Sequence, residues 1–334
     1  MLNNKVVLIT GGTGFFGQAM AETLLNKYKL KKIIIFSRDE NKQYLMKNKF
    51  SKKKHNVLKF FLGDVRDESR LTQAFEGVDF VIHAAALKHV PATEYDPLEC
   101  VKTNIYGAQN IISAALKNSV KKVIAISTDK AVNPINIYGA SKLAADKLFL
   151  SANNIKGSKK ISFSVVRYGN VWSSRGSVVP FFLNIVKNKG PFVPLTDDRM
   201  TRFIISINEG INFVINSLNI MRGGEIFVPK IPSVKILDLA NAIRGKIPIK
   251  ITGIRPGEKL HEVLCGVESS HLTIEYKNFF IIIPDTNFFR SKESFLKYAK
   301  EKGKFVDANF SYNSLNNNFL IKSNNIKSII QNWS

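Results

Sequence analysis

A glycine-rich turn between a buried strand and a helix, close to the N-terminus, most strongly constrains the fold of this chain. The apolar run over 5–10 leads directly into Gly-Gly-Thr-Gly-Phe-Phe-Gly over 11–17, and an amphipathic segment follows. A continuous apolar run of this length is typical of a strand buried on both faces of a parallel sheet. Glycines let the backbone approach a pyrophosphate, which then lies at the helix N-terminus. Together with a second apolar run over 32–36, the pattern predicts a βαβ unit that binds a dinucleotide through Gly11, Thr13, Gly14, Phe15, Phe16 and Gly17.

The residues after the second predicted strand favour one dinucleotide over another. The strand is followed by Ser37, Arg38 and Asp39, with Lys42 one turn later. An acidic residue at this point accepts a hydrogen bond from the ribose of NAD, whereas an Arg meets the 2′-phosphate of NADP. Because Arg38 comes first and Lys42 adds a second cation, we expect NADP. Asp39 leaves NAD as the alternative.

A third strand, predicted over 57–62, ends beside a candidate adenine contact. Asp64 and Val65 follow this strand, and both are expected to lie next to the cofactor. The carboxylate of Asp64 is placed to accept from the adenine amino group. The alternative is a helix N-cap, since a helix is predicted to begin near Asp67.

A fourth strand, predicted over 78–82, leads into three consecutive alanines. Their small side chains allow close approach of a flat ligand such as the nicotinamide ribose. Lys88 could reach a phosphate or a sugar hydroxyl. The histidines on either side of this stretch are interpreted as packing or hydrogen-bonding residues, and no His or Cys cluster has metal-ligand spacing. The residues concerned are His83, Ala84, Ala85, Ala86 and His89.

Strands and helices alternate five times before residue 130, with a long helix predicted over 97–117 and a sixth strand over 161–166. This predicts an α/β fold, a Rossmann-type doubly wound parallel sheet with a smaller C-terminal α/β substrate lobe. We expect a cofactor domain over 1–170, to which some later segments return, a substrate lobe over 171–290, and a tail over 291–334 with no assigned role. In the lobe the predicted elements are a strand over 223–232, a helix over 234–242, a strand over 250–254, a helix from Pro256 and a strand over 279–283.

The stretch 127–142 carries the candidate chemistry. It follows an apolar run over 123–126, so Thr128, Asp129 and Lys130 are expected at the carboxyl end of a buried strand, where open α/β sheets bind ligands. A helix is predicted to begin near Asn136, which places Tyr138 and Lys142 one turn apart on one face. An ammonium near a phenol lowers the phenol pKa from about 10, so Tyr138 becomes a usable base. The same spacing also occurs in ordinary amphipathic helices.

These motifs resemble those of the extended short-chain dehydrogenase/reductases that act on nucleotide sugars. The general match rests on Thr10-Gly11-x-x-Gly14-x-x-Gly17, Asp64-Val65 and Tyr138-x-x-x-Lys142. A narrower match, from about residue 3 to about 285, is to the soluble inverting UDP-N-acetylglucosamine 4,6-dehydratases of pseudaminic acid synthesis, in the CapD-like polysaccharide biosynthesis family. It is carried by 127–131 (Ser-Thr-Asp-Lys-Ala), 168–170 (Tyr-Gly-Asn), 174–180 (Ser-Arg-Gly-Ser-Val-Val-Pro), 199–203 (Arg-Met-Thr-Arg-Phe), 223–232 and 255–262 (Arg-Pro-Gly-Glu-Lys-Leu-His-Glu).

The resemblance implies a role for each residue of the central stretch. Tyr138 would deprotonate the C4 hydroxyl, while Lys142 lowers its pKa and holds the nicotinamide ribose. Asp129 would protonate the leaving C6 hydroxyl, and Lys130 would remove the C5 proton. Many dTDP-glucose dehydratases carry Asp-Glu instead of Asp-Lys, and larger membrane-anchored relatives tend to lack the Tyr. A Lys base must be desolvated or lie near another cation to be neutral at pH 7.

Substrate contacts are expected from the second half of the chain. A UDP-sugar presents a diphosphate, which suits the fork of an Arg side chain. Val171 is expected beside the cofactor. Phe15, where relatives often carry Ser, should have little effect, whereas Trp172-Ser173, where close relatives usually have a small apolar residue and Gly, could alter substrate fit. The expected substrate residues, with Thr128 and Lys88, are Asn170, Arg175, Arg199, Arg202, Arg255 and Glu258.

Composition sets the compartment and the partners that we expect. Only two cysteines are present, no 18-residue apolar run occurs, and the first predicted strand starts by residue 5, so we expect a cytoplasmic protein without membrane association. Relatives assemble, so a homo-oligomer, dimer or hexamer, is expected.

Three other functions are alternatives to the predicted dehydratase activity. The formal net charge of +23 suggests a nucleic-acid-binding protein as an alternative. However, the lysines are dispersed and no aromatic-basic motif appears, so we expect no nucleic acid partner. A UDP-sugar epimerase uses the same Tyr-Lys pair but has no need of Asp129 and Lys130. A cofactor-sensing regulator needs neither Tyr138 nor Lys142.

Overall fold

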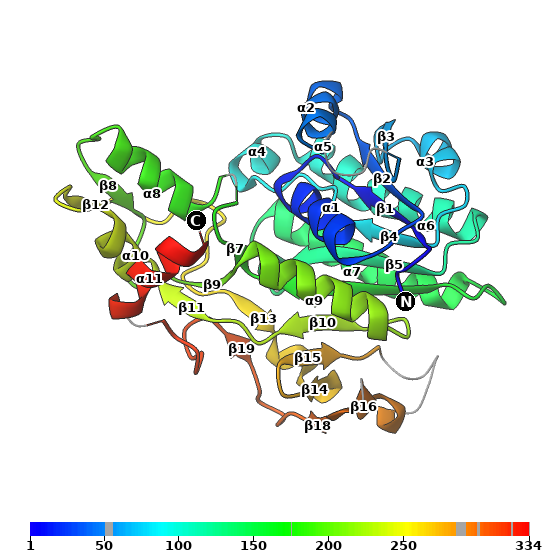
Figure 1. Ribbon diagram of the computed structural model, residues 1–334. Coiled ribbons are helices and arrows are strands. Elements are labelled where there is room, and N and C mark those ends of the chain that lie inside the picture. The colour runs from blue at the N-terminus through cyan, green and yellow to red at the C-terminus, as the bar shows by residue number, and fades with distance from the viewer. Residues whose placement is uncertain (51–55, 175, 285–291, 299–300, 322, 334) are drawn as a thin grey trace.

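A ten-stranded sheet forms the centre of the molecule in the computed structural model, which describes residues 1–50, 56–174, 176–284, 292–298, 301–321 and 323–333 (Figure 1). Its central strands are parallel, and three strands at one edge are antiparallel. The predicted continuous apolar runs form its buried centre because helices cover both faces. In spatial order the strands are β18 (Lys304–Phe305), β14 (Thr273–Glu275), β15 (Phe279–Ile282), β10 (Ile226–Pro229), β6 (Ser162–Tyr168), β5 (Lys122–Thr128), β4 (Phe80–His83), β1 (Val6–Thr10), β2 (Lys32–Ser37) and β3 (Leu58–Leu62).

The helices form two groups on opposite faces of this sheet, which makes it doubly wound as predicted. α1 (Phe15–Lys27) packs against α9 (Ile207–Ile220) on one face. On the other face α6 (Gly107–Lys117) lies between α3 (Glu68–Ala74) and α7 (Ile137–Ile155) (Figure 1). The strand order around β1 is 3-2-1-4-5-6, the order of Rossmann-type sheets. Shorter helices near the ligand edge are α2 (Glu40–Phe50), α4 (Val90–Tyr95) and α5 (Pro97–Val101).

The single long helix predicted over 97–117 is interrupted. A π-helical segment, Lys102–Tyr106, separates α5 from α6. Within it the buried Asn104 amide accepts from the backbone of Leu87 and donates to the Leu87 carbonyl and to Ser141 Oγ. The widened turn thus ties the loop after β4 to α7.

A smaller lobe with its own apolar core lies beside the carboxyl ends of the parallel strands (Figure 1). Its helices are α8 (Val178–Lys187), α10 (Ile236–Ile243) and α11 (Ser323–Trp333). Its strands form two small sheets: β7 (Asn170–Val171), β9 (Thr201–Ile205) and β11 (Ser233–Lys235) pair together, and β8 (Val193–Leu195) pairs with β12 (Ile249–Ile251).

Three predicted elements of this lobe are wrong, and one of them, the strand predicted over 279–283, is β15 of the main sheet. The strand predicted over 223–232 is β10 of the main sheet, shortened because Gly223 and Gly224 adopt positive φ angles of 112° and 94°. No helix begins at Pro256 among the described residues, since Gly257 has a φ of 78° and the backbone turns there instead. The resulting extended loop runs up to Glu262.

The C-terminal tail, which had no assigned role, is part of both lobes. β18 extends the main sheet, and β19 (Tyr312–Asn313) pairs with β13 (Val263–Cys265). A short hairpin, β16 (Lys297–Tyr298) with β17 (Glu301–Lys302), precedes them, and α11 packs on α10. No helix within the described residues is long and apolar enough to cross a membrane.

Candidate active site

The tip of β5 and the start of α7 place the predicted acid–base residues together. Thr128 ends β5, a 3₁₀ turn carries Asp129 and Lys130, and α7 begins after Asn136, whose side chain accepts from the Gly139 amide at 2.7 Å. The helix therefore begins where it was predicted, and Asn136 is its N-cap. A Cβ on Gly139 would collide with the Lys130 carbonyl, so glycine allows the helix to start directly against the turn.

Asp129 and Lys130 form an ion pair in which the Asp129 side chain is fully buried and the Lys130 side chain is 22% exposed. The Lys130 ammonium donates to Asp129 Oδ1 at 2.8 Å and to Asn170 Oδ1 at 3.4 Å. Thr128 Oγ1 donates to the same oxygen of Asp129 at 2.9 Å, while Asp129 Oδ2 is buried without a partner. One carboxylate oxygen therefore remains available to a ligand hydroxyl.

Lys130 is held as a cation in this arrangement. Burial lowers its pKa, but the carboxylates of Asp129 and Glu262 more than offset burial, so the pKa is raised above its ordinary value. The Glu262 carboxylate lies 3.2 Å from Lys130 Nζ. Lys130 is desolvated, which is one of the two conditions that favour a neutral amine. The other condition is a neighbouring cation, but the dominant charges beside Lys130 are carboxylates, which favour the ammonium. A base role then requires that Lys130 first pass its proton to a partner.

Tyr138 lies in the same cluster, but its pKa is raised rather than lowered. Burial raises it to about 12, although Lys130 and a hydrogen bond with Thr128 oppose the rise. The cation that favours the Tyr138 phenolate is thus Lys130. Lys142, which we expected in this role, instead donates to the Ile126 carbonyl at 2.7 Å, and burial lowers its pKa.

The glycine turn has the shape of a pyrophosphate site. Gly14 is the N-cap of α1 and supplies no side-chain cap, so the first amides of the helix face outward without a side-chain acceptor. Gly11 has a φ of 64°, and a Cβ there would lie 2.9 Å from the Ala85 Cα. This close approach brings the turn against the alanines after β4. The residues present therefore fit a dinucleotide.

Basic and acidic side chains both lie at the adenine-ribose end of this groove. Arg38 is half exposed and lies 3.6 Å from Asp64, while Asp39 is engaged by Lys42 at 2.6 Å. Asp64 also accepts from Arg66 at 2.7 Å, and these hydrogen bonds outweigh burial to lower its pKa. Because Lys42 occupies the Asp39 carboxylate, Asp39 is less free to accept from a ribose hydroxyl than the half-exposed Arg38 is to contact a 2′-phosphate. Asp67, not Asp64, caps α3.

His83 is a packing residue, as interpreted. It is fully buried, shares a 2.8 Å hydrogen bond with Thr10 Oγ1, and lies beside the Phe149 ring. Burial, reinforced by Lys142, lowers its pKa to about 3. The imidazole is therefore neutral.

The expected substrate arginines differ in placement. Arg202 is buried on β9 and donates to the carbonyls of Thr201 and Leu260 at 2.8 and 3.0 Å. Arg199 is 65% exposed and pairs with Asp197, and Arg255 is 55% exposed and lies 3.8 Å from Glu258. Arg175 lies outside the described residues. The turn after β4 carries Lys88, whose pKa is lowered by burial and by Lys130.

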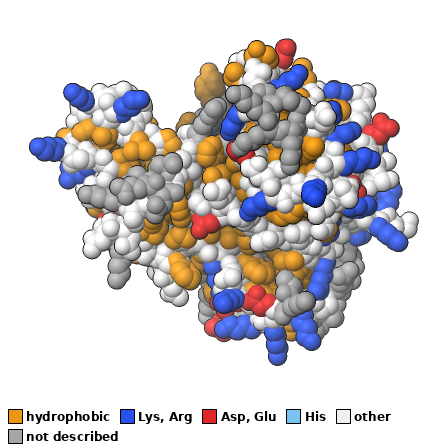
Figure 2. Space-filling view, viewed as in Figure 1, with side chains coloured by type: hydrophobic (Ala, Val, Ile, Leu, Met, Phe, Trp, Pro, Cys, Tyr) orange, Lys and Arg blue, Asp and Glu red, His pale blue; other side chains and the backbone are white. Residues whose placement is uncertain are grey.

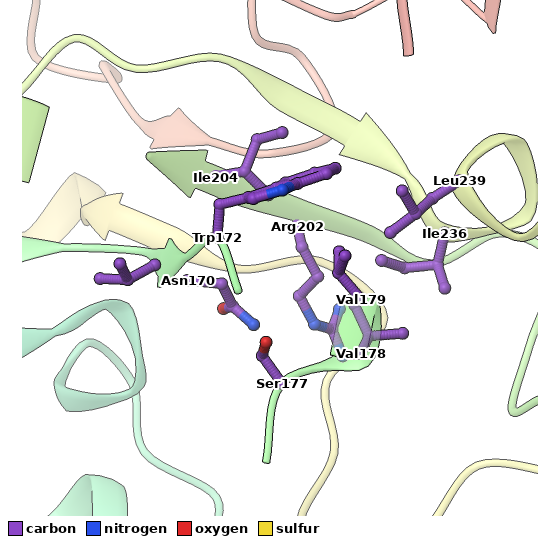
Figure 3. Close-up of a pocket in the computed structure, with 10 residues that line it drawn as sticks. Asn170, Trp172, Ser177, Val178, Val179, Arg202, Ile204, Ile236 and Leu239 are labelled. Carbon is purple, nitrogen blue, oxygen red and sulfur yellow. The ribbon is translucent and has the colours of Figure 1, made fainter. Parts of the chain in front are cut away.

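A small cavity lies in the smaller lobe, and Asn170, which accepts from Lys130, forms part of its lining. The Asn170 amide, the Ser177 hydroxyl and the Arg202 guanidinium converge on it, opposite an apolar wall (Figure 3). Ser177 Oγ and Trp172 Nε1 are buried without hydrogen-bond partners. The remaining lining residues are Val171, Val178, Val179, Ile204, Ile236 and Leu239.

Trp172 and Ser173 each have a local structural explanation. The Trp172 indole is buried in the core of the smaller lobe and lies alongside Ile204 (Figure 3). Ser173 has a φ of 58°, a conformation that favours glycine. A Gly at this position relieves the strain, whereas this chain retains it.

Glu262 and Asn104 are site residues that sequence reasoning missed. Glu262 ends the stretch 255–262, of which only Arg255 and Glu258 were assigned. Its signal was a carboxylate directly before an apolar run, which predicts a buried acid needing a cation. Nothing local marked Asn104, because its partners at Leu87 and Ser141 are distant in sequence.

Residues 7–284 match the family model described as "Polysaccharide biosynthesis protein". A protein of Campylobacter jejuni subsp. jejuni (serotype O:23/36, strain 81-176), named UDP-N-acetylglucosamine 4,6-dehydratase (inverting), is 54% identical over 318 residues, which are 95% of this chain and 94% of that protein. A Rickettsia canadensis protein named UDP-glucose 4-epimerase is 43% identical over 275 residues, 80% of each chain. The X-ray structure of Pen from Bacillus thuringiensis superposes with a TM-score of 0.89, at 36% identity and 99% coverage of both chains.

Proposed function

Because this chain belongs to the polysaccharide biosynthesis protein family, whose model matches most of its length, we propose that it is a UDP-N-acetylglucosamine 4,6-dehydratase that inverts C5. The product would be UDP-2-acetamido-2,6-dideoxy-β-L-arabino-hexos-4-ulose, the first intermediate toward pseudaminic acid. The observation that carries this proposal is the buried Asp129–Lys130 pair at the tip of β5, beside Tyr138. An elimination needs an acid and a base side by side.

The proposed cofactor is NADP, held between the glycine turn and Arg38. When bound, it would supply a reversible hydride acceptor, so no second substrate would be consumed. The glycine turn supplies backbone amides for the pyrophosphate. Arg38 and Lys42 provide positive charge for a 2′-phosphate. The remaining groups are proposed for the adenosine and nicotinamide ends: Phe15, Phe16, Ser37, Asp64, Val65, Ala84, Ala85, Ala86 and Val171.

Tyr138 is the proposed base for the C4 hydroxyl. Its burial makes the phenolate costly, so it needs cationic support. Lys130 provides that support in the described arrangement. Lys142, whose ammonium donates to the Ile126 carbonyl of β5, is proposed to hold the nicotinamide ribose.

Asp129 and Lys130 act as a coupled pair. A proton that moves from Lys130 to Asp129 across their 2.8 Å hydrogen bond converts the ion pair into a neutral acid and a neutral amine. The amine then takes the C5 proton, the C6–O bond breaks, and Asp129 gives its proton to the leaving hydroxide, which departs as water. The pair returns to its charged form. One internal transfer thus prepares both groups, and the elimination resets them.

The UDP-sugar is proposed to lie between the tip of β5 and the smaller lobe, next to the small cavity of Figure 3. Asn170 and Arg202 converge there, and the unpartnered Ser177 hydroxyl and Trp172 indole N–H offer hydrogen bonds to a ligand. Figure 2 shows the surface hollowed between the lobes. The other groups proposed for substrate are Lys88, Thr128, Arg175, Arg199, Arg255 and Glu258.

Incubation with UDP-N-acetylglucosamine in heavy water, without added cofactor, tests the function. We expect a 4-keto-6-deoxy product with deuterium at C5, because the C5 proton exchanges with solvent while the C4 hydrogen moves to C6. Recovery of a C4 epimer alone would overturn the proposal.

A UDP-sugar 4-epimerase is the second candidate, since the Rickettsia relative carries that name. An epimerase needs Tyr138 and Lys142 but no acid at C6. The buried charged pair at Asp129 and Lys130 is then unexplained, because burying charges that do no work is costly. Deuterium incorporated at C5 distinguishes the two activities.

Location and assembly are proposed from the same reasoning. We expect a cytoplasmic homo-oligomer, dimer or hexamer, without a nucleic acid partner. On the face shown in Figure 2, Lys and Arg side chains are scattered over both lobes and form no single patch. Gel filtration with light scattering measures the assembly, and added RNA should dissociate in moderate salt.

A further inference from the structure

We propose that Glu262 is a positioning residue for the acid–base pair. Its carboxylate holds the Lys130 amino group against Asp129 and keeps that group protonated until Asp129 takes the proton. The inference rests on the proposed dehydratase function for its catalytic consequence. The contact itself can be tested separately.

The Glu262 side chain is 3% exposed and faces two cations. One oxygen, Oε1, lies 3.2 Å from Lys130 Nζ and 3.8 Å from Arg202 Nε, whereas Oε2 has no hydrogen-bond partner. A buried carboxylate is costly without compensation, so Lys130 and Arg202 stabilise it. The Lys130 ammonium thus donates to Asp129 and Asn170 and forms an ion pair with Glu262. The amino group is thereby held at one place.

The C-terminal tail fixes the backbone of Glu262. Its amide donates to Ser314 Oγ at 2.9 Å, and the Ser314 amide donates to its carbonyl at 2.8 Å. Ser314 Oγ also bonds to Thr201 Oγ1 at 2.7 Å, which in turn bonds to His261 Nδ1 at 2.9 Å. The carboxylate is therefore presented to Lys130 by two segments, the loop before β13 and the residue that follows β19.

The charge around Lys130 is mixed, so the effect of Glu262 must be weighed against the other groups. The carboxylates of Asp129 and Glu262 stabilise the Lys130 ammonium. The neighbouring cations destabilise it, whereas the Tyr138 phenolate is itself stabilised by Lys130. Removing one of two carboxylates leaves the cations less compensated. The proton on Lys130 then becomes easier to remove. The charged and titratable groups that face Lys130 are Asp129, Glu262, Arg202, Lys88, Lys259 and Tyr138.

Glu262→Gln removes this charge but keeps an oxygen that accepts from Lys130. We expect the pH at which Lys130 becomes reactive to fall by about one to three pH units, the usual effect of an opposite charge at this separation. Trace labelling with acetic anhydride across a pH series, with the Lys130 peptide quantified by mass spectrometry, measures that midpoint. In heavy water, the rate of deuterium exchange at C5 should rise with pH, and in the variant this rise should shift to lower pH together with the labelling midpoint.

Glu275→Gln is the matched control. Glu275 also binds two lysines, Lys230 at 2.8 Å and Lys304 at 3.3 Å, but it lies on β14. It should leave the Lys130 midpoint and the C5 exchange profile unchanged. Glu262→Asp, which keeps the charge on a shorter side chain, should restore the wild-type midpoint while lowering kcat more than it alters KM. A fold requirement alone would not give this pattern.

An unchanged Lys130 midpoint in folded Glu262→Gln overturns the inference. If that variant does not fold, Ser314→Ala, which loosens the backbone clamp, must lower the midpoint, and an unchanged value there overturns it equally. If wild-type protein gives no dehydration but the midpoint still shifts, the proposed function fails and the contact stands. If dehydration occurs and no variant shifts the midpoint, the inference alone fails.

Discussion

The indole of Trp172 meets the indole of Trp333 edge to face, with their ring centroids 5.7 Å apart. Trp172 follows directly on β7 and lines the cavity proposed for substrate, whereas Trp333 lies at the end of α11. The C-terminal helix therefore covers a wall of the site from behind. Edge-to-face aromatic pairs add about 0.5–1.5 kcal/mol beyond the area they bury. The tail contributes to the shape of the cavity without entering it.

Ile326→Ala should destabilise the smaller lobe by about 2–4 kcal/mol, because Ile326 is buried in that lobe's core and its loss leaves a cavity. Urea unfolding followed by Trp fluorescence measures the change. The exposed Ile155, at the end of α7, offers Ile155→Ala as a control that should stay within about 0.5 kcal/mol. Equal losses in both variants would mean that α11 does not pack as described.

Lys130→Ala should bind NADP normally and lose dehydration by about 10²–10⁴-fold, because it removes the proposed C5 base. NADP affinity by fluorescence titration and product formation by NMR measure the two effects. Lys121→Ala, at the opposite end of β5, is the control and should retain full turnover. Persistent C5 exchange in Lys130→Ala would show that another group takes the proton.

Arg38→Ala should weaken NADP binding on the order of tenfold or more and leave NAD binding nearly unchanged, because a guanidinium–phosphate contact is lost. Dissociation constants for both dinucleotides, measured at fixed ionic strength, decide this. Arg244→Ala, in the smaller lobe, removes the same charge away from the cofactor groove. A parallel loss of NAD affinity would show that Arg38 contributes to folding of the groove rather than to phosphate recognition.

Local patterns predicted the parts of the site that are formed by local structure. The strand, glycine turn and helix over 5–27 depend on neighbouring residues, and so does the Asn136 cap that places Tyr138 and Lys142. The signs of the pKa shifts were not predictable in this way. Tyr138 gains most of its shift from burial, which depends on packing from several elements.

Long-range contacts account for what the patterns missed. Glu262 meets Lys130 only because the turn at Gly257 and the β13–β19 pairing bring the loop to the tip of β5. Neither contact has a periodic signature in sequence. The same holds for the tail, whose strands β18 and β19 are two residues each and are defined by their partners. Such short strands carry no pattern of their own.

From the buried imidazole of His83, we predict that the free energy of unfolding depends on pH. Its pKa is lowered to about 3 in the folded protein by burial and by Lys142, against about 6.5 in an unfolded chain. Between these values the unfolded chain binds a proton that the folded protein does not, so stability is fully present above about pH 6.5 and is lost as pH falls toward 3. The slope is about 1.4 kcal/mol per pH unit. His83→Asn keeps a polar partner for Thr10 but cannot titrate, so the free energy of unfolding of wild type relative to the variant should fall with that slope between pH 6 and 4 and be constant above pH 7.5. Urea unfolding across the pH series measures it, and a pH-independent difference throughout would show that His83 can take up a proton without opening the core.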